Sequence, residues 1–502
     1  MARYKHTDAE GGQGMFLTVN LKGQLPPGTF EHMLNGLIGN QIDASMFGMN
    51  YKNDGTGAKA MPPAALIKLI IYGYSKGKKS SRGLWELAGN NIIAKALTAD
   101  MEVHWTTIAK FISSNNEKFQ EVFAKVLVYC VELGLVGGET FAIDGCRLPS
   151  NASMEMSGTE EELKEKLKMY RRMAEKHVAK HRELDEREQK DEEEERHYLK
   201  RQKHLKRQIE KIGAFLETME QKEGKRGKEI KSNVTDNESA MIRSSAGFLQ
   251  GYIGIAVSDK QNQIIISAEA VGSTNEGEYL PDILDTTQRA MNEAGVKTPD
   301  GKNLTALMDN NYFSEENLKA CRERGIEGII PDNQYCKRLE NNNESRYGAS
   351  DFKYHGEGNY YECPNGKRLE YKGEKLLEGR EKQEYGASVK DCRACPLNIR
   401  CVNPQKICTM HNGRRLVITK GTQGESLCGE MCKKLATEEY QNKYAYRIQI
   451  VEPVFANITY CKGLDRFTLR GKGKVNSQWK LYCMVHNLGK CVKGYNKKKG
   501  YA

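Results

Sequence analysis

The chain has 502 residues and a formal net charge of +11, with 28% charged and 38% hydrophobic residues. This length exceeds the roughly 250–300 residues at which a single hydrophobic core stops growing, so we expect at least two domains. No apolar run approaches the roughly 18 residues of a membrane span, and the N-terminal residues lack the apolar stretch of a signal peptide. The totals therefore disfavour a membrane or secreted protein. They predict a soluble, cytoplasmic protein whose positive charge suits nucleic acid.

Residues 1–137 are predicted to form an all-α domain. Pro62 and Pro63 precede the apolar run "AALIKLIIYGY", as proline does at a helix start, and residues 106–135 carry apolar side chains at spacings of three and four. Residues 75–83 form a basic turn between two of these helices. Its cationic residues are Lys76, Lys78, Lys79 and Arg82. The turn is either a solvated loop or a phosphate-contacting edge of a DNA-binding unit.

Residues 159–235 form a highly charged insertion. Apolar residues at alternating spacings of four and three form a coiled-coil seam, and a similar seam begins earlier in the segment. They are Leu205, Ile209, Ile212, Leu216 and Met219, preceded by Leu163, Leu167 and Tyr170. Residues 185–197 carry no such stripe, which predicts a helical hairpin with its turn or a solvated crossing there. The hairpin would serve as a spacer or as a dimerising arm without chemistry of its own.

Strand patterns return after this insertion. Residues 250–273 contain two β-rich runs around a polar turn, and residues 303–309 and 326–330 give two further strands. Helical patterns separate these strands, and Ser314 is a suitable N-cap for the second helix. The alternation predicts an α/β core with a mixed sheet.

Three acids stand out as site candidates. Asp144 and Asp309 each follow an apolar strand run, and Gly145 clears space beside the first. Ligands gather outside the carboxyl ends of strands in α/β sheets, so these two acids could share a site, although either could be an ordinary loop acid. Glu452 lies in an apolar helical pattern five residues after Arg447. It is either paired with that arginine or directed at a metal, and both roles are compatible.

Three carboxylates around hydrated Mg²⁺ suit phosphodiester chemistry. Two hard cations about 3.5–4 Å apart activate an attacking oxygen and stabilise a leaving one. Because Mg²⁺ completes its octahedron with water and substrate phosphates, three protein acids are enough.

A cysteine cluster predicts a second metal site. Four of the 14 cysteines lie within a polar segment, which gives them little core to join and favours a structural Zn²⁺ over buried free thiols. These four are Cys363, Cys392, Cys395 and Cys401. Cys408 and His411 are alternative ligands, and Cys428 with Cys432 is a weaker pair. The basic C-terminal residues 489–500 are either a solvated tail or a site of nonspecific phosphate attraction.

The order of four motifs resembles the DDE transposases of bacterial insertion sequences, in the branch with a helical N-terminal domain. The motifs are "AIDGCRLPSNAS", "GYIGIAVSD", "ALMDNNYFSEENLKACRERGI" and "YRIQIVEPVFANI", and the resemblance spans residues 15–492. It implies an RNase H-like catalytic core with Asp144, Asp309 and Glu452 as the triad that binds two Mg²⁺ ions, with Mn²⁺ as an alternative. It also implies that Tyr444 and Arg447 belong to the family's tyrosine, arginine and glutamate signature.

The chain departs from the family pattern in two places. Thr459 stands where a lysine usually follows the glutamate by seven residues, and Lys462 is a candidate substitute for that phosphate contact. His104 and Trp105 stand where relatives commonly have a proline and an aspartate. The second departure concerns DNA recognition and not the catalytic residues.

The resemblance implies a homodimer that binds double-stranded DNA at the element's terminal inverted repeats and at a target, working at the nucleoid. An RNase H-like nuclease without strand transfer and a non-enzymatic, zinc-stabilised DNA-binding protein are the alternatives. We expect the domain organisation to follow six segments. They are the helical DNA-binding domain 1–137, the core segments 138–158 and 236–335, the hairpin insertion 159–235, the cysteine insertion 336–435, and the catalytic helices with the basic tail, 436–502.

Overall fold

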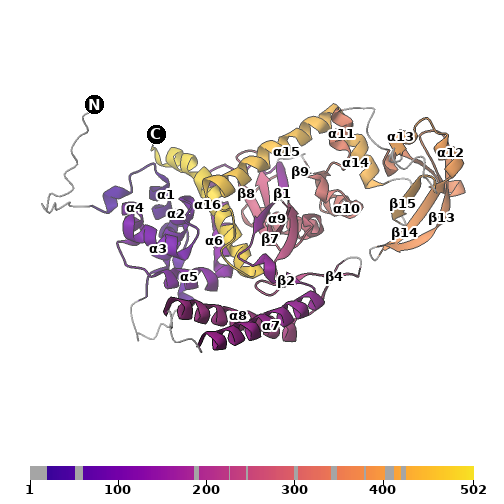
Figure 1. Ribbon diagram of the computed structural model, residues 1–502. Coiled ribbons are helices and arrows are strands. Elements are labelled where there is room, and N and C mark those ends of the chain that lie inside the picture. Colours follow the sequence, from indigo (N-terminus) through magenta and orange to yellow (C-terminus); the bar gives the residue numbers. More distant parts are fainter. Residues whose placement is uncertain are drawn as a thin grey trace, which may run out of the picture. The chain divides into compact units, whose positions relative to one another are not determined.

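The computed structural model divides the chain into two compact units, one of residues 1–114 with 495–502 and one of residues 115–494 (Figure 1). We call these the smaller and the larger unit. The structure describes residues 20–50, 60–185, 192–224, 227–244, 247–298, 303–340, 347–377, 380–401, 412–419 and 426–501.

The smaller unit is helical, as its sequence predicts. Its α-helices are α1 (Phe30–Asn40), α2 (Pro63–Ser75), α3 (Ser81–Asn90), α4 (Ile92–Thr98) and α5 (Trp105–Ser114). Helix α2 starts at Pro63, where a missing N–H costs nothing. The Ser80 hydroxyl caps α3, and the Asn91 side chain caps α4 by accepting two backbone N–H groups. Leu66 and Leu84 are fully buried in its core.

A mixed six-stranded sheet forms the centre of the larger unit. Its strands are β1 (Thr140–Pro149), β6 (Ala240–Ser244), β7 (Gly247–Asp259), β8 (Ile265–Val271), β9 (Leu304–Met308) and β10 (Ile326–Ile329). The order is β10-β9-β1-β7-β6, with β8 also paired to β7. β1, β9 and β10 are parallel, whereas β7 is antiparallel to β1, β6 and β8. This sheet confirms the predicted α/β class.

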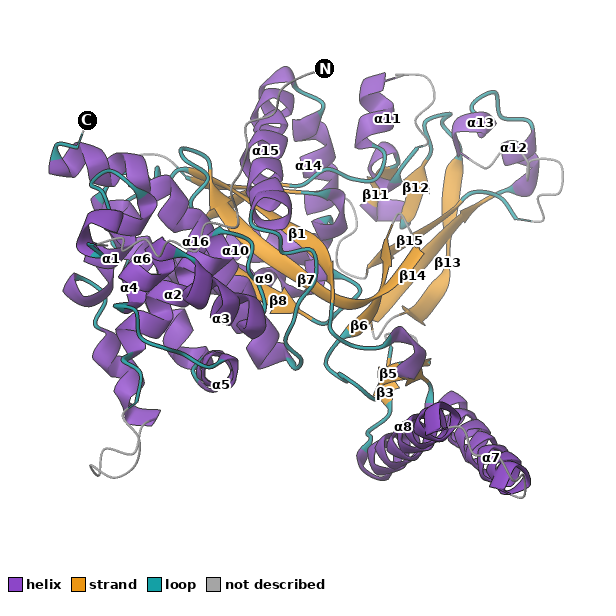
Figure 2. Cartoon of the chain, turned by 60° about the vertical axis from the view of Figure 1, so that its left-hand side comes forward, coloured by secondary structure: helices purple, strands orange, loops and turns teal. Residues whose placement is uncertain are grey.

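Helices cover both faces of this sheet (Figure 2). α9 (Leu280–Glu293) contacts β8, and α10 (Glu315–Glu323) contacts β10. The two helices also contact each other. A Cβ added at Gly254 of β7 would touch the Trp479 ring of α16 (Lys472–Lys499), whereas one added at Gly145 of β1 would touch Glu276. These two glycines occupy successive cross-strand pairs, so α16 and Glu276 lie on opposite faces. On the α16 side, Phe455 of α15 (Glu438–Ala456) stacks on Trp479.

The charged insertion contains the expected helix pair. α7 (Glu160–Asp185) and α8 (Glu192–Thr218) pack together along the predicted seam, where Leu163 and Ile212 are fully buried. Part of the expected turn, residues 186–191, lies outside the described residues. Short strand pairs follow at the base of the helices: β2 (Ser157–Gly158) with β5 (Ser232–Asn233), and β3 (Lys222–Glu223) with β4 (Glu229–Ile230).

A second, antiparallel sheet occupies the segment in which the sequence predicts only a cysteine cluster. Its five strands, in spatial order, are β11 (Lys353–His355), β12 (Tyr360–Glu362), β13 (Arg368–Leu377), β14 (Arg380–Ala387) and β15 (Arg415–Thr419). Leu369, Tyr385 and Leu416 are buried in its core. Two short helices, α12 (Val389–Arg393) and α13 (Asn398–Cys401), lie between β14 and β15.

Two boundaries differ from the predictions. Helix α6 (Asn116–Glu132) belongs to the larger unit, so residue 137 does not divide the two units. Asp144 does not end its strand, because β1 continues to Pro149 through its antiparallel pairing with β7. Within the described part of the chain, no helix has both the length and the apolar character needed to cross a bilayer.

Candidate metal centre

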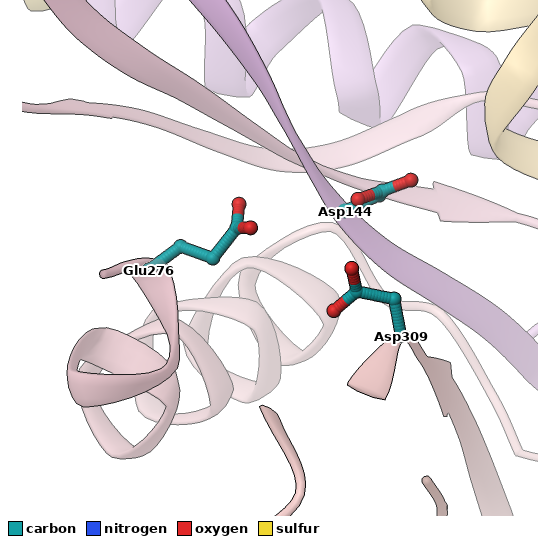
Figure 3. Close-up of side chains that lie close together, drawn as sticks. All are labelled: Asp144, Glu276 and Asp309. Carbon is teal, nitrogen blue, oxygen red and sulfur yellow. The ribbon is translucent and has the colours of Figure 1, made fainter. Parts of the chain in front are cut away.

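Three carboxylates gather at one place on the central sheet (Figure 3). They belong to Asp144 on β1, Asp309 directly after β9, and Glu276 at the start of a 3₁₀ turn, η4 (Glu276–Tyr279). One oxygen from each lies within 4.8 Å of the others. Among the described residues, these three are the one group of three or more His, Cys, Asp or Glu side chains that lie closely enough together to share a metal ion.

The strand register explains why the two aspartates meet. The parallel pairing of β1 with β9 ends at Ile143 and Met308, and each of these residues is followed by an aspartate. Adjacent parallel strands are about 4.8 Å apart, so acids at equivalent positions become neighbours. Backbone and side-chain donors then hold the carboxylates: Asp144 accepts the Gly145 N–H at 2.8 Å, and Asp309 accepts the N–H and the side-chain amide of Asn311, both at 3.0 Å.

Glu276 reaches the aspartates because two glycines leave room for it. A Cβ at Gly145 would lie 1.7 Å from the Glu276 Oε2 atom, and a Cβ at Gly277 would lie 2.6 Å from the Asn311 carbonyl oxygen. Asn317 ties the two loops together by donating to the carbonyls of Gly277 and Tyr312 at 3.0 and 2.9 Å. The position of Glu276 is therefore fixed by several independent contacts.

Arg447 brings a cation to the same site. It lies on α15, which packs against β1, β7 and β9, and its Nη1 donates to Asp144 Oδ2 at 2.8 Å. Tyr444 lies one helical turn earlier, packs edge-on against Tyr335 at 5.4 Å and contacts the Arg447 guanidinium. Burial raises the pKa of Tyr444 to about 12. The tyrosine and arginine of the expected signature therefore stand beside the two aspartates.

Burial and mutual repulsion disfavour three charges in this group. Burial raises the pKa of Asp144, although Arg447 and the Gly145 N–H oppose the shift. Burial and then the Asp144 charge raise the pKa of Asp309. Burial, Asp309 and Asp144 together raise the pKa of Glu276 to about 7. Carboxylates this close carry their full charge only when a cation offsets the repulsion.

The unsatisfied polar atoms around the acids suit a hydrated divalent ion. Glu276 Oε2, the Tyr312 hydroxyl and Arg447 Nε are buried and have no hydrogen-bond partner among the described residues. Buried polar groups are nearly always satisfied, so each of these atoms needs an ion, a water or a substrate atom. The donors are carboxylate oxygens, which Mg²⁺ and Mn²⁺ prefer. The residues therefore fit a magnesium or manganese site.

Glu452, the third acid expected from the sequence, lies outside the close group. It is exposed on α15. Of the apolar positions in its pattern, Val451 and Ile458 are buried, whereas Ile448 is 57% exposed. Its charge still raises the pKa of Asp144, although it is the smallest of the contributing causes. Thr459 donates to the Phe455 carbonyl at 2.8 Å, and Lys462 follows the helix end and places its charge near His486.

Lys76, Lys78 and Lys79 of the basic turn lie between α2 and α3, and Arg82 lies in the first turn of α3. Lys76 pairs with Glu31 at 3.2 Å, and Lys78 approaches Glu86 at 3.9 Å. The Arg82 guanidinium stacks on the Trp105 ring at 4.9 Å. Lys76, Lys78 and Arg82 are exposed and Lys79 is partly exposed. These contacts leave all four cations close to solvent.

The four expected zinc ligands line one small cavity, together with Phe352, Leu369 and Arg414. Their residues are Cys363, Cys392, Cys395 and Cys401. Backbone N–H groups of Lys367 and Arg414 donate to the sulfurs of Cys363 and Cys392, both at 3.3 Å. Burial raises the pKa of Cys401 to about 11.

The alternative ligands have different settings. Cys408 and His411 lie outside the described residues. Cys428 and Cys432 lie on α14 (Leu427–Leu435), where burial and the nearby Glu315 carboxylate raise the pKa of Cys428. A thiol beside a carboxylate is a poor source of thiolate, which makes this pair the weaker one, as the sequence suggests.

The sequence interpretation missed Glu276, although a signal was present. Glu276 follows β8 by five residues and precedes α9, which is the strand-end setting that singled out the two aspartates. The polar stretch "GSTNEGEY" hid it, because its acids resemble helix-start residues that favour the helix dipole. Only the approach of η4 to β1 distinguishes Glu276 from them.

Two family models match the chain. Residues 19–114 match a transposase domain (DUF772), and residues 362–492 match a transposase DDE domain. The second match includes Tyr444, Arg447 and Glu452, whereas Asp144, Glu276 and Asp309 lie between the two matched segments. No curated protein matches the chain. The two domain matches confirm the resemblance carried by the motifs and are consistent with a DDE transposase of insertion sequences.

Proposed function

We propose that the protein is a DNA transposase that binds the terminal inverted repeats of an insertion sequence and catalyses metal-dependent strand cleavage and strand transfer. The meeting of Asp144 and Asp309 beside Arg447 is the observation that carries this proposal. Water would attack the phosphodiester at the element end, releasing a 3′-hydroxyl. That hydroxyl would then attack a target phosphodiester, from which the target's own 3′-oxygen leaves.

The catalytic core is proposed to be RNase H-like. The sheet order supports this proposal. β1, β7 and β8 are three adjacent antiparallel strands, and the parallel strands β9 and β10 extend the sheet on the other side of β1. Helices α9 and α10 connect the later strands. The aspartates lie where the parallel pairing ends, which is where α/β sheets collect ligands.

Asp144 and Asp309 are proposed to hold divalent cations, with Glu452 as the family's third acid. When bound, two such cations supply activation of the attacking oxygen and stabilisation of the leaving oxygen. The chain's own residues orient the site: Arg447 and the Gly145 N–H hold Asp144, and Asn311 holds Asp309. Arg447 Nε has no hydrogen-bond partner in the described segments and would donate to a phosphate oxygen.

DNA binding is proposed to involve both units. The cations Lys76, Lys78, Lys79 and Arg82, which are exposed or partly exposed, would contact phosphates. Such contacts supply affinity without sequence information. Tyr444, Arg447 and Lys462 would contact DNA near the cleaved bond. Because a transposase must hold two element ends, we propose that a homodimer acts at the nucleoid.

The cysteines are proposed to bind a structural Zn²⁺. The support is that Cys363, Cys392, Cys395 and Cys401 line one cavity. Burial, with smaller contributions from neighbouring cysteines, raises the pKa values of Cys392 and Cys401. Four thiolates around one ion form a closed structural site that contributes folding energy directly. The ion would join β12 to the two short helices that precede β15.

A strand-transfer assay tests the proposed function and separates it from its alternatives. Purified protein is incubated with a labelled fragment ending in the element's terminal repeat, a supercoiled target and Mg²⁺. We expect joined products from the natural protein, and a loss of both cleavage and joining by about 10³-fold or more in Asp144→Asn or Asp309→Asn. The variants should bind the labelled fragment normally.

Other outcomes would select an alternative. Cleavage without joined products would indicate a nuclease. Binding without cleavage in the natural protein, unchanged by either substitution, would indicate a DNA-binding protein and contradict the proposal. The matched control is Asp282→Asn, which removes an acid from the first turn of α9 without touching the three carboxylates.

A further inference from the structure

Glu276 has the burial and the hydrogen-bond pattern expected of a metal ligand. Glu276 is only 3% exposed. Its Oε1 atom accepts a hydrogen bond from the Asn311 side-chain amide at 3.1 Å. Within the part of the chain that the structure describes, its Oε2 has no hydrogen-bond partner. Leaving a buried carboxylate oxygen unpaired is costly, so a structure that does so needs a further group at that atom.

The surroundings hold Glu276 at the aspartates and not merely near them. Glycine is the residue type that avoids a clash with Glu276 Oε2 at position 145, because a Cβ atom there would lie 1.7 Å from that oxygen. The Asn275 side chain accepts the Gly277 N–H at 3.1 Å, which fixes the turn that carries Glu276. Asn311 donates to both Glu276 and Asp309 through the same amide nitrogen, which sets the spacing of these two acids.

The charges of the group leave room for one divalent cation. In the part of the chain that the structure describes, Arg447 is the one cation that forms an ion pair with a member of this group, and its partner is Asp144. Arg147 acts on Glu276 and Asp309 from a greater distance and donates to the Arg243 carbonyl. Three carboxylates and one paired guanidinium leave a charge of −2 when all are ionised.

Glu452 lacks these features. It is exposed, it is not part of the close group, and it lies on a different element, α15. An exposed carboxylate is fully solvated in the protein alone and gains little from binding an ion there unless a substrate phosphate completes the coordination shell.

We propose that Asp144, Asp309 and Glu276 together bind one divalent cation before DNA is present, and that Glu452 is not needed for this binding. The inference rests on the proposed function for its account of what the ion does, but it concerns a separate property, the composition of the DNA-free metal site. Glu276 is thereby a fourth acid of the catalytic centre, beyond the three of the family motif. Glu452 would take part only when DNA arrives.

Titration of the full-length, metal-stripped protein with Mn²⁺ in the absence of DNA tests this inference. Free Mn²⁺ is measured by electron paramagnetic resonance for the natural protein and for Glu276→Gln, Glu452→Gln, Glu278→Gln and Asp144→Asn. We expect Glu276→Gln to raise the Kd for Mn²⁺ by about tenfold or more, as loss of a well-placed ligand does. Glu452→Gln should leave the Kd within about twofold of the natural value.

The remaining variants separate the possible failures. Glu278→Gln removes an exposed acid two residues away and controls for net charge. If Asp144→Asn weakens Mn²⁺ binding while Glu276→Gln does not, the inference is overturned and the proposed function stands. If no substitution affects Mn²⁺ binding, the metal centre itself is wrong. A weaker Mn²⁺ affinity in Glu452→Gln, with Glu276→Gln unchanged, would also overturn the inference.

Glutamine at 276 should not prevent folding. It keeps the shape of the side chain and the Asn311 contact, and it removes repulsion from two neighbouring acids. Far-ultraviolet circular dichroism and the melting temperature without metal verify this. The Mn²⁺-induced increase in melting temperature gives a second measure of binding, and this increase should be smaller in Glu276→Gln than in Glu452→Gln.

Discussion

The three acids of the central sheet and the four cysteines of the second sheet are both candidate metal centres, but they differ in what holds them. The acids come from β1, β9 and η4, which lie far apart in sequence and are brought within 4.8 Å by a rigid sheet. The cysteines come from a loop and two short helices, and they do not form an equally close group among the described residues. The acids are therefore placed by elements of the central sheet and the adjacent η4, whereas the cysteines lie on short segments that a shared ion would tie together.

This difference predicts different consequences of metal removal. A site that the fold builds by itself holds its acids against burial and mutual repulsion, which raise the pKa values of Glu276 and Asp309. Removing the ion from the acid site should lower activity and change the folded structure little. A site that closes around its ion contributes folding energy when the ion binds, so losing that ion should cost structure.

The largest expected effect is therefore at the cysteines. Cys395→Ser should reduce zinc content from about one ion per chain to nearly none and destabilise the second sheet by more than about 3 kcal/mol. Zinc is measured by atomic absorption, and hydrogen exchange compares β13 and β14 with β1 and β7. Cys461→Ser, an exposed cysteine elsewhere, is the control. Retained zinc and unchanged exchange in Cys395→Ser would remove the structural role assigned to this cluster.

The next expected effect is a loss of folding stability at low pH. It must be distinguished from any effect of the metal sites. Burial lowers the pKa of His486 to about 4, with smaller contributions from Lys490 and Lys462. The folded protein therefore binds fewer protons than the unfolded chain, so stability is lost as pH falls from about 6.5 to about 4, by up to about 3 kcal/mol. His486→Gln should flatten this part of the profile in denaturant unfolding, whereas the exposed His204→Gln should not. An unchanged slope in His486→Gln would contradict the assignment.

A smaller effect is expected from filling the space beside the acids. Gly145→Ala forces a Cβ onto Glu276, which should destabilise the larger unit by about 1–3 kcal/mol and weaken Mn²⁺ binding. Gly213→Ala on α8 meets no neighbouring atom and should stabilise its helix by up to about 1 kcal/mol. Urea unfolding of the two variants checks the pair. Equal stabilities would show that Glu276 is not held against Gly145.

The smallest effect is the stabilisation by Mg²⁺. At a concentration about tenfold above its Kd, a ligand of the native state adds about 1.4 kcal/mol. We expect Mg²⁺ to raise the melting temperature modestly and Asp309→Asn to abolish the rise. A loss of several kcal/mol on adding a magnesium-specific chelator would show instead that the acid site is needed for folding, and the contrast between the two regions would fail.

The sequence predicts much of the central sheet because local patterns specify it. The apolar runs before Asp144 and Asp309, the turn after Asp259 and the cap at Ser314 all have local causes, and the structure contains each feature. The motif order supplies the transposase resemblance, which the two domain matches confirm. Local patterning and chain order are thus enough to indicate where two of the three close acids lie.

The rest depends on contacts between distant residues. Glu276 looks like a helix-start acid until η4 is placed against Gly145, 131 positions earlier in the chain. β13 and β14 also escaped prediction, because their charged residues mask the alternation that buries Leu369 and Tyr385. Glu452 shows the reverse case, since its apolar neighbours suggest a buried face whereas its side chain is exposed.

The most direct test of the central claim is a crystal of the DNA-free protein soaked in Mn²⁺, with data collected near the manganese absorption edge. The account predicts an anomalous difference peak among Asp144, Glu276 and Asp309, with one oxygen of each residue about 2.1 Å from the peak. A peak bound by Asp144, Asp309 and Glu452 that leaves Glu276 uncoordinated, or no peak among these acids at saturating Mn²⁺, would contradict it.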